Sequence, residues 1–257
     1  EPALEAALPA LHSILAPGLY QKGEIDLLCD PAGQVQVAVR GPCRGRAAEA
    51  LVGQGGVAGV ILGRQVFGAA ALEIEPGQWA QADRFAQPSR DGNAALIAAV
   101  DSATRPREGA RILELYAGSG NLTRTLLDGA ASVLAVDTRP GRQIGHPRLR
   151  WQVGPVEEVA ADLVGRGAGG ASTDRLEIDL VVLDPPREGA RAALDSIAAL
   201  GAPRVVYVSC DPATLARDLD RLAELGYRAL RAGAIDLMPQ TAHVEVVVSL
   251  ELTARTA

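Results

Sequence analysis

Residues 111–137 read RILELYAGSGNLTRTLLDGAASVLAVD, and this stretch decides the fold. Apolar runs at 112–115 and 133–136 predict two strands, and the sequence between them predicts a glycine-rich turn and a helix. A strand, a helix and a second strand in this order are typical of a parallel sheet that is covered by helices on both faces.

The same alternation continues toward the end of the chain. Further apolar strands are expected at 149–153, 180–183 and 205–208, and helices near 121–128, 156–164, 189–200 and 212–225. The last two expected strands, at about 228–236 and 243–251, have no helix between them. They are therefore expected to pair as an antiparallel hairpin, which ends an otherwise mostly parallel α/β sheet.

The first 80 residues predict a separate, small α+β domain. The expected elements are a helix at 3–15, a hairpin of 23–29 and 34–40, a helix at 44–54, and strands at 57–62 and 70–75. Residues 76–91 are more polar and precede a helical run that starts after Ser89. We therefore expect two domains, at 1–80 and 81–257.

Charge and composition exclude several classes of protein. The 25 basic and 31 acidic residues give a net charge of -6, so a nucleic-acid partner would have to bind a local basic patch. No apolar run is long enough to cross a membrane and no signal peptide precedes the first helix, so we expect a cytoplasmic protein. Cys29, Cys43 and Cys210 lack the spacing of a zinc site, and no metal is expected.

Two features predict a nucleoside site. Gly118 and Gly120 lie in a turn between a strand and a helix, where a ligand can approach the backbone closely. Asp137 ends the next strand, where a carboxylate can accept hydrogen bonds from ribose hydroxyls. Asp184 follows the apolar strand 180–183 and is expected at the same ligand-binding edge of the sheet.

Cys210 and Glu245 are the candidate reactive residues. Cys210 lies between an expected strand and a helix that Asp211 would cap; the helix N-terminus favours a thiolate, whereas the charge of Asp211 opposes it. Glu245 alternates with valines in the last strand, so partial burial is expected to raise its pKa and suit it to general base catalysis. His243 is interpreted as a structural residue.

Five segments resemble a known family. ELYAGSGN (114–121), VLDPPREGA (182–190), VYVSCDPATLARDL (206–219), DLMPQTAHVE (236–245) and Gln87 in FAQPSRDGNAAL are similar to segments of the uracil-C5 RNA methyltransferases, which form 5-methyluridine in tRNA and rRNA. The resemblance is specific over residues 80–250 and loose over 1–79. It implies a Rossmann-like class I methyltransferase domain, S-adenosylmethionine as cofactor and RNA as partner.

The resemblance also implies roles for single residues. Cys210 would add to C6 of uracil, and Glu245 would remove the proton from C5. The cofactor would be lined by the glycine-rich turn and by five side chains, which are Gln87, Tyr116, Asn121, Asp137 and Asp184. We expect a monomer without an iron–sulfur cluster.

Two alternatives stay open. Asp184-Pro185-Pro186 also resembles the motif of amino-methyltransferases, although Arg187 stands where those enzymes have an aromatic residue. The link between Asp137 and Trp151 is too short and proline-rich for the long helix that usually follows in the family. A non-catalytic RNA-binding protein with a weakened cofactor site is therefore the other alternative.

Overall fold

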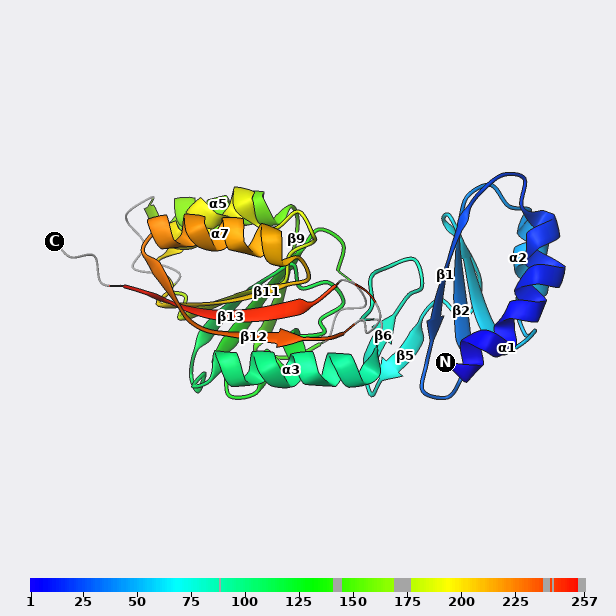
Figure 1. Ribbon diagram of the computed structural model, residues 1–257, viewed down its shortest axis with the longest axis horizontal. Helices are drawn as coiled ribbons and strands as arrows, with labels where there is room; N and C mark the ends of the chain where they lie inside the picture. Colours follow the sequence, from blue (N-terminus) through cyan, green and yellow to red (C-terminus); the bar gives the residue numbers. More distant parts are fainter. Residues whose placement is uncertain (88, 141–144, 169–176, 238–240, 242, 254–257) are drawn as a thin grey trace. The chain divides into compact units, whose positions relative to one another are not determined.

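The computed structural model describes residues 1–87, 89–140, 145–168, 177–237, 241 and 243–253 (Figure 1). The chain divides into two compact units, Glu1–Ala86 and Gln87–Ala257. The sequence places this division six residues earlier, at residue 80. None of the helices in the described part of the chain is long and apolar enough to cross a membrane.

The first unit is a four-stranded sheet with helices packed on one face. Its elements in chain order are α1 (Pro2–Ala10), a π-helical turn (Leu11–Leu15), a 3₁₀ turn (Ala16–Gly18), β1 (Glu24–Cys29), β2 (Val35–Arg40), α2 (Gly45–Leu51), β3 (Val57–Leu62), β4 (Gln65–Gly68), β5 (Leu72–Glu75) and β6 (Gln78–Ala80). The sheet order is β1-β2-β3-β4, while β5 and β6 form a separate hairpin. Leu15, Leu51 and Val37 are fully buried where the helices meet the sheet.

The second unit contains the predicted α/β sheet. Its elements are α3 (Arg90–Thr104), β7 (Arg111–Leu115), α4 (Thr123–Leu127), β8 (Ser132–Asp137), β9 (Leu149–Val153), α5 (Val156–Ala168), β10 (Leu180–Leu183), α6 (Arg191–Leu200), β11 (Arg204–Ser209), α7 (Pro212–Glu224), β12 (Tyr227–Ile235) and β13 (Glu245–Leu252). The strand order is β12-β13-β11-β10-β7-β8-β9. The strands β11, β10, β7, β8 and β9 are parallel to one another. β13 pairs antiparallel with both β11 and β12. The mostly parallel sheet and its terminal hairpin are confirmed.

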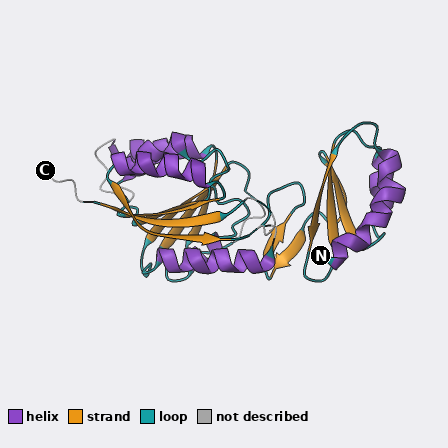
Figure 2. Ribbon diagram, in the orientation of Figure 1, coloured by secondary structure: helices purple, strands orange, loops and turns teal. Residues whose placement is uncertain are grey.

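Helices cover both faces of this sheet (Figures 1 and 2). Strand side chains alternate between the two faces. Leu113, Val181 and Val205 point into a core formed with α5, α6 and α7. Ile112 and Val182 point into a second core formed with α3 and α4. Both faces are thus buried, and any site for a ligand has to lie at an edge of the sheet.

Candidate active site

The predicted site residues gather at one edge of the seven-stranded sheet. Tyr116, Asp184 and Cys210 directly follow β7, β10 and β11, and Asp137 is the last residue of β8. These four strands are parallel, so their carboxyl ends lie at the same edge. Open parallel sheets bind their ligands at this edge.

The glycine-rich turn after β7 is held against the end of β8. Tyr116 adopts a φ of 61°, which is uncommon for a residue with a side chain, and Gly118 and Gly120 have φ values of 55° and 87°. The N–H of Gly118 donates a hydrogen bond to Asp137 Oδ2 (2.9 Å). The Tyr116 hydroxyl donates to Glu157 Oε1 (3.1 Å). A Cβ atom at Gly118 would meet no atom within 4 Å, so the backbone there borders open space.

The arrangement around Asp137 fits a ribose. Its Oδ1 accepts a hydrogen bond from the Arg139 N–H (2.7 Å), and its Oδ2 accepts one from Gly118. Two backbone donors therefore fix the orientation of the carboxylate. Each oxygen retains a further lone pair that a ribose hydroxyl could use.

Asn121 links the glycine-rich turn to α3. Its side-chain amide donates to Asn93 Oδ1 (2.7 Å) and accepts from Asn93 Nδ2 (3.0 Å). Asn93 is buried, and sequence reasoning did not identify it as a partner. This reciprocal amide pair positions the start of the helical segment that follows the turn.

Glu114 is a buried carboxyl group beneath the turn. Its Oε2 accepts a hydrogen bond from Thr123 Oγ1 (2.6 Å). Burial is the main cause that raises the pKa of Glu114 to about 8, and the nearby charges of Asp184 and Asp137 act in the same direction. Among the described residues, no cation contributes to the shift in the pKa of Glu114.

Strand register brings Cys210 beside Glu245. In the antiparallel pair of β11 and β13, Ser209 lies opposite Val246. Cys210 directly follows the end of β11, and Glu245 is the first residue of β13, so the register brings the two close together, and the charge of Glu245 acts on the Cys210 thiol. Leu183 of β10 lies opposite Tyr207 of β11, which brings Asp184 to the same edge.

The pKa values at this edge are shifted upward. Burial raises the pKa of Glu245 to about 6, as expected for a glutamate placed among valines. Burial, together with the charge of Glu245, raises the pKa of Asp184 to about 8. The partly buried thiol of Cys210 also has a raised pKa, caused first by burial and then by the Glu245 charge. The N-terminus of α7 thus does not give Cys210 a net low pKa.

Arg187 is the cation that opposes these effects. Its charge and a side-chain hydrogen bond both lower the pKa of Cys210. Arg187 Nη2 lies 3.1 Å from His243 Nε2, and His243 comes two residues before Glu245. The sequence analysis interprets His243 as a structural residue and does not foresee its pairing with Arg187.

Asp211 and Asp218 hold the backbone around Cys210. Asp211 caps α7 by accepting a hydrogen bond from the Thr214 N–H (2.8 Å), which confirms the predicted cap. The fully buried Asp218 accepts hydrogen bonds from the Tyr207 hydroxyl (2.7 Å) and the Ala190 N–H (2.8 Å). These contacts join β11, α6 and α7 behind the site.

Two predicted features contribute less to this cluster. Gln87 is half-buried, and within the described residues it makes no hydrogen bond to another predicted site residue. The link from β8 to β9 contains no helix in its described residues, 138–140 and 145–148. No group of three or more metal-binding side chains occurs in the part of the chain that the structure describes.

Comparisons with known proteins agree with this geometry. A family model described as tRNA (uracil-5-)-methyltransferase matches residues 167–253. The chain is 38% identical over 173 residues to the 23S rRNA (uracil(1939)-C(5))-methyltransferase RlmD of Hahella chejuensis, covering 65% of this chain and 39% of that protein. It is also 38% identical over 169 residues to the protein of the same name from Pseudomonas aeruginosa, covering 65% and 37%. The chain thus spans about two fifths of the length of these curated relatives.

A solved structure shows the same fold. The tRNA (uracil-54, C5)-methyltransferase of Pyrococcus abyssi, in complex with S-adenosyl-L-homocysteine, superimposes with a TM-score of 0.65. The two sequences are 19% identical, and the match covers 96% of this chain and 66% of that chain. At this level of identity the likeness extends to the fold.

Proposed function

Because the chain belongs to the family of uracil-C5 RNA methyltransferases, we propose that it transfers a methyl group from S-adenosylmethionine to C5 of a uridine in RNA. The observation that carries this proposal is the meeting of Cys210, Glu245 and Asp184 at the carboxyl edge of the sheet. The same edge carries the open glycine-rich turn.

The cofactor would bind at the turn after β7. Gly118 leaves room beside its backbone, and Asp137 presents fixed carboxylate oxygens to a ribose. By resemblance, Gln87, Tyr116 and Asn121 complete this site. When bound there, S-adenosylmethionine supplies an electrophilic methyl group.

Cys210 would activate the uracil ring. C5 of uracil is a poor nucleophile, and addition of the Cys210 thiolate to C6 pushes an electron pair toward the C4 carbonyl, which makes C5 enolate-like. The target base has to leave its stack to reach the sulfur, as for other enzymes that modify bases. The partial exposure of Cys210 is consistent with such an approach.

Glu245 would act as the general base. After methylation, C5 still carries its hydrogen, and removal of that proton allows the bond between sulfur and C6 to break. A pKa of about 6 leaves Glu245 mostly ionised at pH 7, yet close enough to neutrality for efficient proton transfer. Both the product and the free Cys210 thiolate are then released.

The proposal is tested by trapping the covalent adduct. Fluorine at C5 cannot be removed as a proton, so RNA that contains 5-fluorouridine should remain bonded to Cys210 in the presence of S-adenosylmethionine. Transcripts of 23S rRNA and of tRNA would be compared, and the modified peptide would be identified by mass spectrometry. Cys210→Ala should form no adduct, whereas the control Cys43→Ala should form it normally.

Two further measurements separate the alternatives. Methyl transfer that persists in Cys210→Ser would favour an amino-methyltransferase in which the thiol takes no part. Absence of any heat on titration with millimolar S-adenosylmethionine would favour a binding protein without catalysis. Either result would overturn the proposed reaction.

A further inference from the structure

The thiol of Cys210 has more negative than positive neighbours. Glu245 and Asp184 raise its pKa through their charges, in addition to the effect of burial. Asp211, next in the chain, is ionised as the cap of α7. Without a nearby cation, a thiolate at this position would be strongly disfavoured.

Arg187 is placed to supply that cation. Besides its contact with Cys210, its charge lowers the pKa of Asp211, so the guanidinium lies close to both groups. Among the ion pairs of the described residues, none occupies Arg187 with a carboxylate partner. The segment before it is stiffened by Pro185 and Pro186, and Gly189 closes a turn onto the Pro186 carbonyl (2.8 Å).

His243 fixes the side chain of Arg187. Arg187 Nη2 and His243 Nε2 are 3.1 Å apart, and an arginine can only donate a hydrogen bond. His243 Nε2 therefore accepts, which assigns the neutral ring with its hydrogen on Nδ1. The backbone of His243 is held in turn, because its N–H donates to Thr241 Oγ1 (3.2 Å).

We propose that His243 is a positioning residue, which holds the Arg187 guanidinium beside the Cys210 sulfur as the counter-ion of the thiolate. The inference rests on the proposed function, because it takes Cys210 as the nucleophile. It adds a step that the covalent mechanism needs, namely how a thiolate forms next to Glu245 and Asp184.

The proposal predicts the reactivity of Cys210 in the free protein. The rate of alkylation by iodoacetamide would be measured between pH 6 and 10, and each cysteine would be followed separately by peptide mass spectrometry. Arg187→Gln should move the midpoint for Cys210 upward by about one pH unit, because the loss of a neighbouring opposite charge has effects of that size. Cys43 serves as an internal control, and its profile should stay unchanged.

Variants of His243 test the positioning role. His243→Leu should shift the Cys210 midpoint in the same direction as Arg187→Gln, but by about half as much, because the arginine keeps its charge and loses its anchor. His243→Gln retains an acceptor oxygen and should restore the wild-type profile. A variant whose second unit is unfolded would be recognised by the loss of its thermal unfolding transition.

Two results would overturn the inference. If the Cys210 profile is the same in wild type and Arg187→Gln, the arginine is not the counter-ion. If Arg187→Gln shifts the profile but His243→Leu does not, the histidine does not position it. The assay needs neither RNA nor S-adenosylmethionine, so a protein that shows the shifts but methylates no RNA would refute the proposed function alone.

Discussion

The acidic side chains at the two edges of the seven-stranded sheet have pKa values that are shifted in opposite directions. At the carboxyl edge, burial raises the pKa values of Glu114, Asp184 and Glu245. At the amino edge, arginine partners lower the pKa values of Asp101 and Asp179. The first edge keeps groups ready to exchange protons, and the second keeps them permanently charged and paired.

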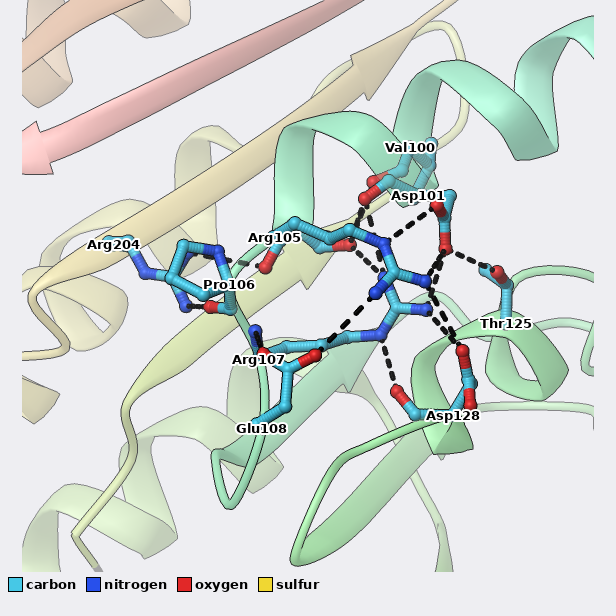
Figure 3. A network of polar contacts seen from close by, with 10 residues as sticks. Val100, Asp101, Arg105, Pro106, Arg107, Glu108, Thr125, Asp128 and Arg204 are labelled. Carbon is cyan, nitrogen blue, oxygen red and sulfur yellow. Dashed lines mark hydrogen bonds and ion pairs between the residues drawn. The ribbon is translucent and has the colours of Figure 1, made fainter.

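Figure 3 shows how completely the amino edge is paired. The side chain of Arg107 is fully buried and donates to Asp101 Oδ1 (2.6 Å), Thr104 Oγ1 (2.9 Å) and the Asp128 carbonyl (2.7 Å). Arg204, at the start of β11, donates to the Pro106 carbonyl (2.5 Å). These partners compensate for the burial of the Arg107 charge. Acids with shifted pKa values and without a cation partner are instead typical of functional sites.

The largest predicted effect is on catalysis at the carboxyl edge. Glu245→Gln should lower turnover by about 10²- to 10⁴-fold, because the amide cannot accept the C5 proton. Its melting temperature should not fall, since the substitution removes a buried acid that has no cation partner of its own. Methyl transfer and thermal unfolding would be measured on the same samples.

Glu251→Gln is the matched control for this prediction. Glu251 lies on the same strand, β13, but its side chain is exposed. Its replacement should leave turnover and melting temperature unchanged. Full activity of Glu245→Gln would show that another group removes the proton.

The next largest effect is on stability at the amino edge. Asp101→Asn should lower the free energy of unfolding at pH 7 by about 2 kcal/mol, because it removes the nearer of the two carboxylates that pair with the buried Arg107 and leaves Asp128 at 3.6 Å. The arginine contacts hold the pKa of Asp101 at about 2, below its ordinary value of 3.8. Stability from this group is therefore present above pH 4 and is lost as the pH falls toward 2.

Urea unfolding at pH 7 and at low pH would check this. The difference between wild type and Asp101→Asn should shrink as the pH falls below 4. Asp162→Asn, an exposed change on α5, should alter the free energy by no more than about 0.5 kcal/mol. An equal loss in both variants would show that pairing with arginine adds no stability at the amino edge.

The sequence predicts the elements of the large sheet well because each has a strong local signal. Apolar runs give the strands β7, β8, β10 and β11, and β3 matches its predicted range of 57–62. In the first unit, β4 and β6 were missed because they have only four and three residues, too few to show an alternating pattern; each is held by pairing with the strand just before it in the chain. The predicted helix at 3–15 changes to a π-helical turn after α1, where Pro9 lacks a backbone donor.

The sequence could predict those site residues whose place depends only on their position along a strand. Cys210 and Glu245 follow from strand ends and alternation, and register then brings them together. The contact of Arg187 with His243 joins residues 56 positions apart. No local pattern encodes such a contact, so it needed the three-dimensional structure.

A smaller effect is expected for the buried acid beneath the glycine-rich turn. The pKa of Glu114 rises from 4.5 to about 8 on folding, so the native state binds this proton more tightly than the unfolded chain. Its contribution to stability is therefore complete below pH 4.5 and is lost as the pH rises toward 8. Glu114→Gln, which does not titrate, should gain stability relative to wild type as the pH rises from 5 to 8.

Denaturant unfolding at the two pH values would measure this gain. The amide oxygen of Glu114→Gln can still accept from Thr123 Oγ1, so the variant separates charge from the loss of a hydrogen bond. Thr123→Val is the companion variant, because it removes the hydrogen bond and leaves the carboxyl group. A stability difference that does not depend on pH would show that Glu114 is not held neutral by the fold.

The smallest predicted effect is that of replacing Arg105, which is compared with Arg107 in the same amino edge. Arg105 contacts Asp101 and Asp128 as Arg107 does, but 47% of its side chain is exposed, against 0% for Arg107. Water and salt screen an exposed pair, so Arg105→Gln should lower the free energy of unfolding by less than about 1 kcal/mol, and by less still in 0.5 M NaCl. Arg107→Gln should lower it by several kcal/mol at either salt concentration, since burial excludes the screening ions. Equal losses in the two variants would mean that the number of contacts, and not their burial, makes this edge stable.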